Sequence, residues 1–225
     1  MIRARALRRL ASVTCLGAAV VGCGSAPASS VALDECPTAA PTADEASTIL
    51  AGAGAVVVDT NLGRFRIELY PDAAPIAAAN FVALVRCRFY QQITFHRVIA
   101  GFVIQAGDPQ TRTKRGAFDG IGTGGPGYGF TIEPPASGYT YEQYTVSMAN
   151  SARPDTNGSQ FFIDLANLDA RLDRLYTIFG RVVEGTEVVD AIGAVATNGA
   201  QDPPTPAYVP LDPVIIESIT VESGS

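Results

Sequence analysis

Apolar and polar residues alternate along part of the chain in a way that predicts paired strands. The run AVVVDT, residues 55–60, is apolar enough for a buried strand. In RFRIELY, residues 64–70, every second residue from Phe65 to Leu69 is apolar and the residues between them are charged. The turn residues Asn61–Gly63 join the two runs, so the pattern predicts a β-hairpin with one solvated face.

Two other segments have the spacing of helices. In APIAAANFVALVRCRFY, apolar residues recur on one helical side as far as Cys87, and Pro75 suits the first turn. A second, shorter helix is predicted at Gly185–Ile192, with Thr186 as its cap. The pattern also allows a helical turn within residues 44–50.

Short apolar runs separated by turn residues supply the remaining elements. Strands are predicted at Thr94–Ile99, Phe102–Ala106, Phe130–Ile132, Thr145–Ala149, Phe161–Asp164, Tyr176–Val182 and Val214–Val221. Parallel strands would need a helix at every crossover, and only two helices are predicted. The chain is therefore expected to be mainly β, as an antiparallel barrel or sandwich.

The N-terminal segment has the composition of an export signal. Basic residues precede an apolar run at Leu10–Val21, which is too short to span a bilayer comfortably. Its end, Val20–Cys23, resembles the bacterial lipobox, in which the cysteine is acylated; the alternative is an ordinary signal peptide that contains Cys23. We expect residues 1–22 to be a cleaved lipoprotein signal peptide. Residues 23–54 would then be a lipidated N-terminus and flexible Ala/Pro/Ser/Thr-rich linker, and residues 55–225 the domain.

Charge excludes several classes of partner. The chain has a formal net charge of −6, and loss of residues 1–22 would leave 12 basic and 22 acidic side chains. Such a chain repels nucleic-acid phosphates and anionic lipid surfaces, and it has a single lysine, Lys114. We expect no nucleic-acid partner and membrane attachment only through the lipid.

Cysteine usage leaves two thiols in the mature chain. Cys15 would leave with the signal peptide and Cys23 would carry the lipid, so that Cys36 and Cys87 remain in an oxidising compartment. They either form a disulfide across a loop of about fifty residues or stay as two free thiols.

This chain lacks the residues that the most common catalytic mechanisms require. The stretch GTGGPG, residues 122–127, matches a dinucleotide fingerprint by spacing only, because a strand follows it. It is either a mobile loop or the rim of a ligand groove. His96 is the only histidine, which favours a packed core residue over a general base, and no residues have metal-ligand spacing.

One arginine nevertheless stands in an apolar run, FHRVIAGFVIQAGDP, residues 95–109. A half-buried guanidinium is costly, so Arg97 belongs either to a structural ion pair or to a binding site. Rotation about an X-Pro amide needs no base, nucleophile or metal. It needs a pocket for the ring and a donor aimed at the prolyl nitrogen, which a guanidinium supplies.

Several long motifs together resemble one family. FHRVIAGFVIQAGD, GTGG, SMAN, NGSQFFI and IFGRVVEGTEVVDAI are similar, in order and spacing, to the cyclophilin family of peptidyl-prolyl cis-trans isomerases. The resemblance covers roughly residues 55–222. It implies a closed eight-stranded antiparallel barrel capped by two α-helices, with the substrate groove on its outer surface and no cofactor.

The resemblance also implies the site. Arg97 takes the place of the catalytic arginine, and Gln105 that of the glutamine that orients the substrate backbone. The other implied substrate-binding residues are Phe102, Val103, Phe162 and Leu172 in the proline pocket with Tyr176 beside them, Ala149 and Asn150 along the peptide, and Gly122 and Thr123 at the neighbouring pocket.

Four departures from the family pattern affect the groove. Val103 stands where methionine is frequent, Tyr176 replaces a common histidine, and the loop SARPDTNGS is one residue longer than usual. Arg171 falls where many eukaryotic members have the tryptophan that contacts cyclosporin. We therefore expect weak cyclosporin binding with isomerisation retained.

These observations favour a monomeric isomerase, anchored outside the cytoplasm to the bacterial membrane, that acts on Pro-containing segments of exported or cell-envelope proteins. The main alternative is a cyclophilin-like module that binds such segments without turnover. An unrelated barrel with a structural arginine is the third hypothesis.

Overall fold

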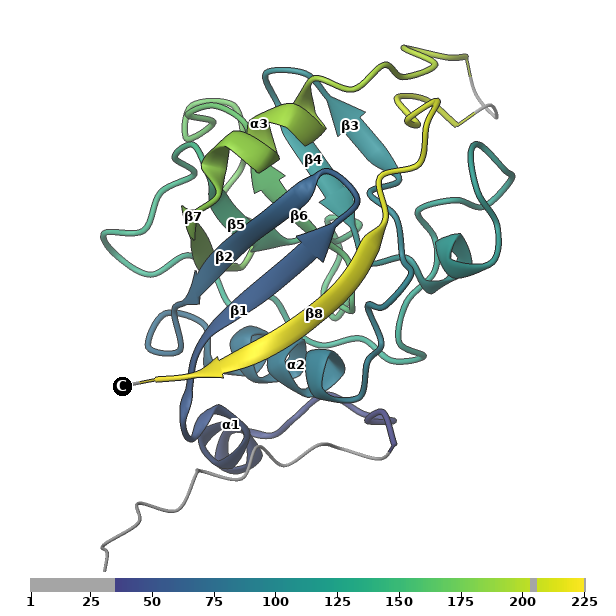
Figure 1. Cartoon of the computed structure of the whole chain (residues 1–225). Coiled ribbons are helices and arrows are strands. Elements are labelled where there is room, and N and C mark those ends of the chain that lie inside the picture. The colour runs from purple at the N-terminus through teal and green to yellow at the C-terminus, as the bar shows by residue number, and fades with distance from the viewer. Residues whose placement is uncertain (1–34, 203–205, 225) are drawn as a thin grey trace, which may run out of the picture.

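Eight antiparallel strands form one curled sheet in the computed structural model, which describes residues 35–202 and 206–224 (Figure 1). The strands are β1 (Ala53–Thr60), β2 (Gly63–Leu69), β3 (Arg97–Ile99), β4 (Val103–Ala106), β5 (Thr145–Met148), β6 (Phe161–Asp164), β7 (Ile178–Glu184) and β8 (Ile216–Ser223). Their order in the sheet is β3-β4-β6-β5-β7-β2-β1-β8. The described helices are α1 (Ala43–Leu50), α2 (Pro75–Arg86), α3 (Thr186–Gly193) and the 3-10 turn η1 (Pro109–Arg112).

The predicted hairpin with one solvated face is confirmed. Strands β1 and β2 pair antiparallel around the turn, with Val58 opposite Phe65. Phe65, Ile67 and Leu69 are buried, whereas Arg64 and Glu68 are exposed. The alternation of apolar and charged residues therefore decides which face of β2 meets the core.

The prediction of a closed barrel is wrong, because the sheet is open between β3 and β8. Among the described residues, its two edges meet only at a short bridge, where the amides of Gln92 and Phe95 donate to the carbonyls of Ile216 (2.8 Å) and Val214 (2.9 Å) and the Ile216 amide donates to the Ile93 carbonyl (2.8 Å). Strand β3 itself is only three residues long, and its outward amide at Val98 donates to the carbonyl of Tyr208 (2.9 Å). The connection before β8 thus occupies the edge that a closing strand would use.

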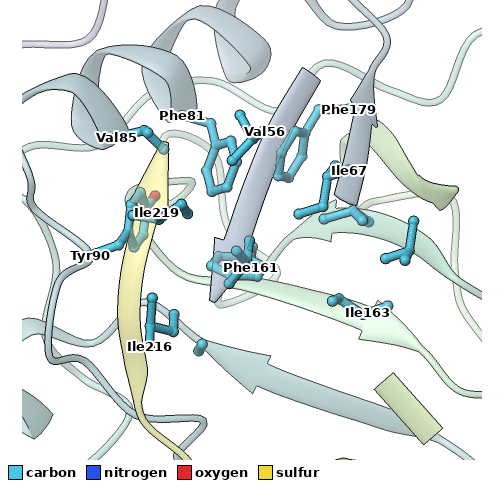
Figure 2. Packing of buried hydrophobic residues seen from close by; sticks show 14 of the residues in the cluster. Val56, Ile67, Phe81, Val85, Tyr90, Phe161, Ile163, Phe179, Ile216 and Ile219 are labelled. Carbon is cyan, nitrogen blue, oxygen red and sulfur yellow. The ribbon is translucent and has the colours of Figure 1, made fainter. Parts of the chain in front are cut away.

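The core fills the inside of the curled sheet, and α2 lies across one end of it (Figures 1 and 2). The predicted helix here is confirmed, and its residues 77–85 are all buried. The ring of Phe81 packs against Phe161 and Phe179, with centroids 5.3 and 5.0 Å apart. The second predicted helix is α3, whose Val189 and Ile192 join the same core.

The start of α2 is capped by a residue far away in sequence. Ala74 provides no side-chain cap. Instead the Glu133 carboxylate accepts hydrogen bonds from the amides of Ile76 (2.9 Å) and Ala77 (2.8 Å). A carboxylate at a helix N-terminus satisfies free amides and complements the helix dipole, so Glu133 fixes the loop before β5 to this helix.

The described part of the expected flexible linker is docked on the domain. Helix α1 begins with a capping box between Thr42 and Glu45. Its Ile49 and Leu50 pack against the core, and the Arg86 side chain donates to the Ile49 carbonyl (2.7 Å). The expected signal peptide, Cys23 and the first part of the linker lie outside the described residues. Within the described ranges, no helix has both the length and the apolar character needed to cross a bilayer.

A disulfide between Cys36 and Cys87 fixes this segment to the C-terminal end of α2, with Cα atoms 5.1 Å apart. It closes a loop of 51 residues, for which chain entropy gives at most about 4 kcal/mol of stabilisation. We expect the Cys36→Ser/Cys87→Ser variant to unfold at lower urea, with a free energy of unfolding lower by about 2 to 4 kcal/mol.

Equilibrium urea unfolding with and without reductant measures this effect. Reductant should destabilise the parent chain and leave the double variant unchanged. Equal midpoints for the oxidised parent and the variant would show that the bridge contributes nothing to the stability of the domain.

Candidate active site

Three neighbouring strands place the two predicted catalytic residues and Phe162, predicted to bind substrate, in one row. In the sheet, Arg97 of β3 lies opposite Gln105 of β4, and Gln105 lies opposite Phe162 of β6. Directly opposed residues point to the same face of a sheet. The intervening residues Ile104 and Ile163 are buried in the core, so the row lies on the outer face.

Beside this row is a second apolar cluster, separate from the main core. It contains the buried residues Val103, Tyr141, Phe162, Leu168 and Ile178, with Phe102, Ala149, Leu172 and Tyr176 among the half-buried residues packed against them. The rings of Phe162 and Tyr176 meet edge to face, with centroids 5.4 Å apart. The structure therefore brings together all five residues expected around the proline pocket, Phe102, Val103, Phe162, Leu172 and Tyr176.

Arg97 brings a charge to the edge of this apolar cluster. Its side chain is half-buried, and burial lowers the pKa of the guanidinium while the nearby Tyr176 and Tyr208 oppose that shift. Arginine nevertheless stays charged at neutral pH. None of the five ion pairs in the described part of the chain includes Arg97, so the structural ion-pair hypothesis fails there. Its recorded polar contact is with the Gln105 amide oxygen, at 3.4 Å.

A chain of amides continues from Arg97 across the site. Gln105 donates to the side-chain oxygen of Gln160 (2.9 Å), and Gln160 donates to the carbonyls of Gly122 (2.9 Å) and Gly124 (2.8 Å). Gln160 lies within the NGSQFFI motif, but the motif alone did not predict a role for this residue. The only available signal was its position one residue before β6, beside Phe161.

The glycine-rich stretch forms the rim of a cavity of about 510 Å³. The cavity is lined by Gln105, Gly122, Thr123, Ala149 and Asn150, among others. Hence five predicted site residues surround one space, and Ala149 also contacts the apolar cluster. Of the two readings of GTGGPG, the rim of a groove agrees with this placement.

The single histidine is packed beneath the site. His96 is 4% exposed, and neither ring nitrogen has a hydrogen-bond partner. Burial lowers the pKa of His96 to about 4, with partial opposition from Asp108, so the ring is neutral at pH 7. No group of three or more His, Cys, Asp or Glu residues suited to hold a metal occurs in the described ranges.

A buried carboxyl lies next to the pocket and was not anticipated. Asp164 is opposite Val103 and two residues after Phe162, on the same face of the sheet as both. It is 0% exposed, and neither carboxyl oxygen has a partner. Desolvation raises the pKa of Asp164 to about 8. Its neighbour Tyr141 is also buried. The Tyr141 hydroxyl donates a hydrogen bond to the Tyr176 carbonyl (2.9 Å), which fixes the loop that carries Tyr176.

The curled antiparallel sheet thus carries a half-buried arginine beside an external apolar cluster. The model of the family "Cyclophilin type peptidyl-prolyl cis-trans isomerase/CLD" matches residues 55–221. The chain belongs to this family and is a peptidyl-prolyl cis-trans isomerase by that membership.

Relatives of known name agree. Peptidyl-prolyl cis-trans isomerase A of Mycobacterium tuberculosis is 42% identical over 179 residues, covering 72% of this chain and 88% of that protein. Isomerase B of Streptomyces anulatus is 42% identical over 182 residues, covering 73% and 94%. A cyclophilin type isomerase of Cryptosporidium parvum, solved in the presence of the dipeptide Ala-Pro, matches with a TM-score of 0.63 and 34% identity over 76% of this chain and 99% of that one.

Proposed function

We propose that Arg97 performs the isomerisation by donating a hydrogen bond to the prolyl nitrogen while the amide loses its resonance. The observation that carries this proposal is a charged, half-buried guanidinium without a carboxylate partner in the described structure, in register with Gln105 and Phe162. A donor in a desolvated site stabilises a developing lone pair more strongly than water does. The amide barrier of about 18–20 kcal/mol is mostly the loss of resonance. A donor to the prolyl nitrogen therefore lowers the main part of this barrier.

The surrounding residues would hold the substrate in the required position. The proline ring would bind against the second apolar cluster, where Val103 and Phe162, which are 3% and 5% exposed, form the floor of the pocket. Gln105 would hold the substrate backbone. Asn150, whose amide donates to the Leu175 carbonyl (2.9 Å), would present its neighbouring backbone to the extended peptide. The Ala-Pro dipeptide named for the Cryptosporidium relative supports a Pro-containing ligand for this groove.

The place of action is also a proposal. The export signal expected in residues 1–22, the lipobox-like Cys23 and the disulfide between Cys36 and Cys87 all suit a protein outside the cytoplasm. We propose a monomer anchored to the bacterial membrane by an N-terminal lipid, whose substrates are Pro-containing segments of exported or cell-envelope proteins.

Exchange NMR on an Ala-Pro peptide tests the activity. We expect the full chain at catalytic concentration to accelerate cis-trans exchange well beyond the uncatalysed rate, whose time scale is tens of seconds or longer. Shifted peptide signals without faster exchange would favour the binding module instead. Unchanged signals and unchanged exchange would contradict both. Weak cyclosporin binding remains a prediction, and inhibition of this exchange by nanomolar cyclosporin would contradict it.

A further inference from the structure

Arg171 lies on the rim of the proline pocket and covers one of its residues. Its guanidinium carbon is 4.7 Å from the centre of the Phe102 ring, and its Nη1 is 3.5 Å from the carbonyl oxygen of Gly101. Phe102 packs against the pocket cluster, and Gly101 is in the turn between β3 and β4. Stacking on an aromatic face orients a guanidinium without neutralising its charge.

This guanidinium is exposed and takes part in none of the ion pairs in the described ranges. A second arginine of the same loop differs from it. Arg174 is paired with Asp169 at 3.6 Å and donates to the carbonyls of Pro135 (3.2 Å) and Tyr139 (3.0 Å). Arg171 thus keeps most of its five N–H donors free, at the groove of a chain whose net charge is −6.

Arg171 contacts Gly101 of the hairpin that carries Arg97, which limits its distance from the proposed reacting bond. Arg97 and Gly101 are four residues apart on the β3-β4 hairpin. At about 3.3 Å per residue, four residues of extended chain span at most about 13 Å. A peptide lying along this face would therefore bring a side chain one to three residues from the proline within reach of Arg171.

We infer that Arg171 is a specificity residue that favours acidic side chains one to three positions from the proline on one side of the substrate. The inference rests on the proposed use of the groove for Pro-containing peptides. It identifies the preferred clients as acidic segments around proline, although the protein as a whole is acidic and would repel them without a local cation.

Pairs of peptides that differ only by Glu or Gln test this inference. Each pair places the residue at one of the three positions before or after an Ala-Pro unit, and exchange NMR gives kcat/KM for both members. Exposed ion pairs contribute about 0.2–1 kcal/mol. We therefore expect the Glu peptide to be favoured about 1.4- to fivefold at one or two positions on a single side. High salt should reduce that ratio toward one because the pair is solvent-exposed.

Variants at the two arginines of this loop provide the decisive comparison. The Arg171→Gln variant should give a Glu/Gln ratio near one, and Arg171→Glu should favour Lys over Gln at the same position. Arg174→Gln removes the same charge from a group already paired with Asp169, and it should leave the ratio unchanged. Equal rates for Glu and Gln peptides in the parent chain, or the same ratio in Arg171→Gln, would overturn the inference.

The inference can be separated from the proposed function. If the chain does not accelerate cis-trans exchange of the neutral Ala-Pro peptide, the proposed catalysis fails. Chemical-shift titrations of the peptides then give the Glu/Gln ratio from their affinities alone. A ratio of one in those affinities would reject Arg171 as a specificity residue, and a ratio lost only in Arg171→Gln would support it.

Discussion

An Arg97→Ala variant is expected to lower kcat/KM for an Ala-Pro peptide by roughly 10²–10³-fold, the range found when one preorganised donor to a developing charge is removed. The guanidinium is half-buried and opposite Gln105, so water cannot replace it with an equally oriented donor. The loss should fall mainly on kcat, because the apolar floor of Val103 and Phe162 remains to bind the proline. Exchange NMR at several peptide concentrations separates the two parameters.

Two further variants make that result specific. Arg97→Lys keeps a positive charge but not the planar fork of donors, and we expect it to fall between the parent and the alanine variant. Arg66→Ala removes an arginine of β2 that is paired with Glu222 (2.7 Å) on β8. It should change kcat/KM less than twofold. An Arg97→Ala variant with parental kcat and only a raised KM would show that Arg97 binds the substrate without assisting the rotation.

The Asp164→Asn variant is expected to be more stable than the parent at neutral and alkaline pH. In the folded chain, burial without a partner raises the pKa of Asp164 from 3.8 to about 8. Below its unfolded pKa the carboxyl is neutral in both states, so its ionisation costs the folded state no stability. As the pH rises from about 4 to about 8, the unfolded chain ionises while the folded chain stays protonated, and this stability is lost. At 1.36 kcal/mol per pKa unit, the upper limit of this loss is about 6 kcal/mol.

Urea unfolding of parent and variant at pH 4, 6 and 8 measures this contribution. The two free energies of unfolding should be similar at pH 4, and the difference should grow in favour of the variant toward pH 8. Burial of neutral His96, whose pKa is lowered to about 4, destabilises both proteins as pH falls below its unfolded value of 6.5. That effect cancels in the difference between them.

An exposed carboxylate serves as the control for Asp164. Asp119 lies in the loop after η1 and is exposed, so Asp119→Asn should change the free energy of unfolding at pH 8 by less than about 0.5 kcal/mol. A difference between Asp164→Asn and the parent that is the same at all three pH values would show that Asp164 does not take up a proton on folding.

Sequence patterns identified most elements whose burial follows from local periodicity. The hairpin of β1 and β2 and the helix α2 follow directly from alternation and helical spacing. Helix α1 confirms the helical turn that the pattern allows within residues 44–50, but it lies within a stretch rich in Ala, Pro, Ser and Thr that we expected to be a flexible linker. Its few large side chains, Ile49 and Leu50, pack against the core, and a disulfide between Cys36 and Cys87, which are 51 residues apart, holds the segment. Neither feature leaves a periodic signal.

The extent of the barrel was likewise beyond local pattern. Both edge segments contain apolar runs that predict strands, and a family resemblance implies closure. Two edges can pair only where their backbone amides and carbonyls are still free. Here the Tyr208 carbonyl already accepts a hydrogen bond from the Val98 amide of β3. The connection that carries Tyr208 has no sequence feature that predicts this competition.

The sequence by itself determined the class of the protein and the residue types of its site. The motifs that resemble the cyclophilin family contain Arg97, Gln105 and Phe162, and the pairing of adjacent strands places the three in one row. Only the tertiary structure decided the environment of those residues. It shows Arg97 without an ion-pair partner in the described ranges, Gln160 joined to the glycine rim, Asp164 buried without a partner and Arg171 stacked on Phe102. Desolvation and pairing depend on neighbours that are distant along the chain, and a linear pattern does not contain them.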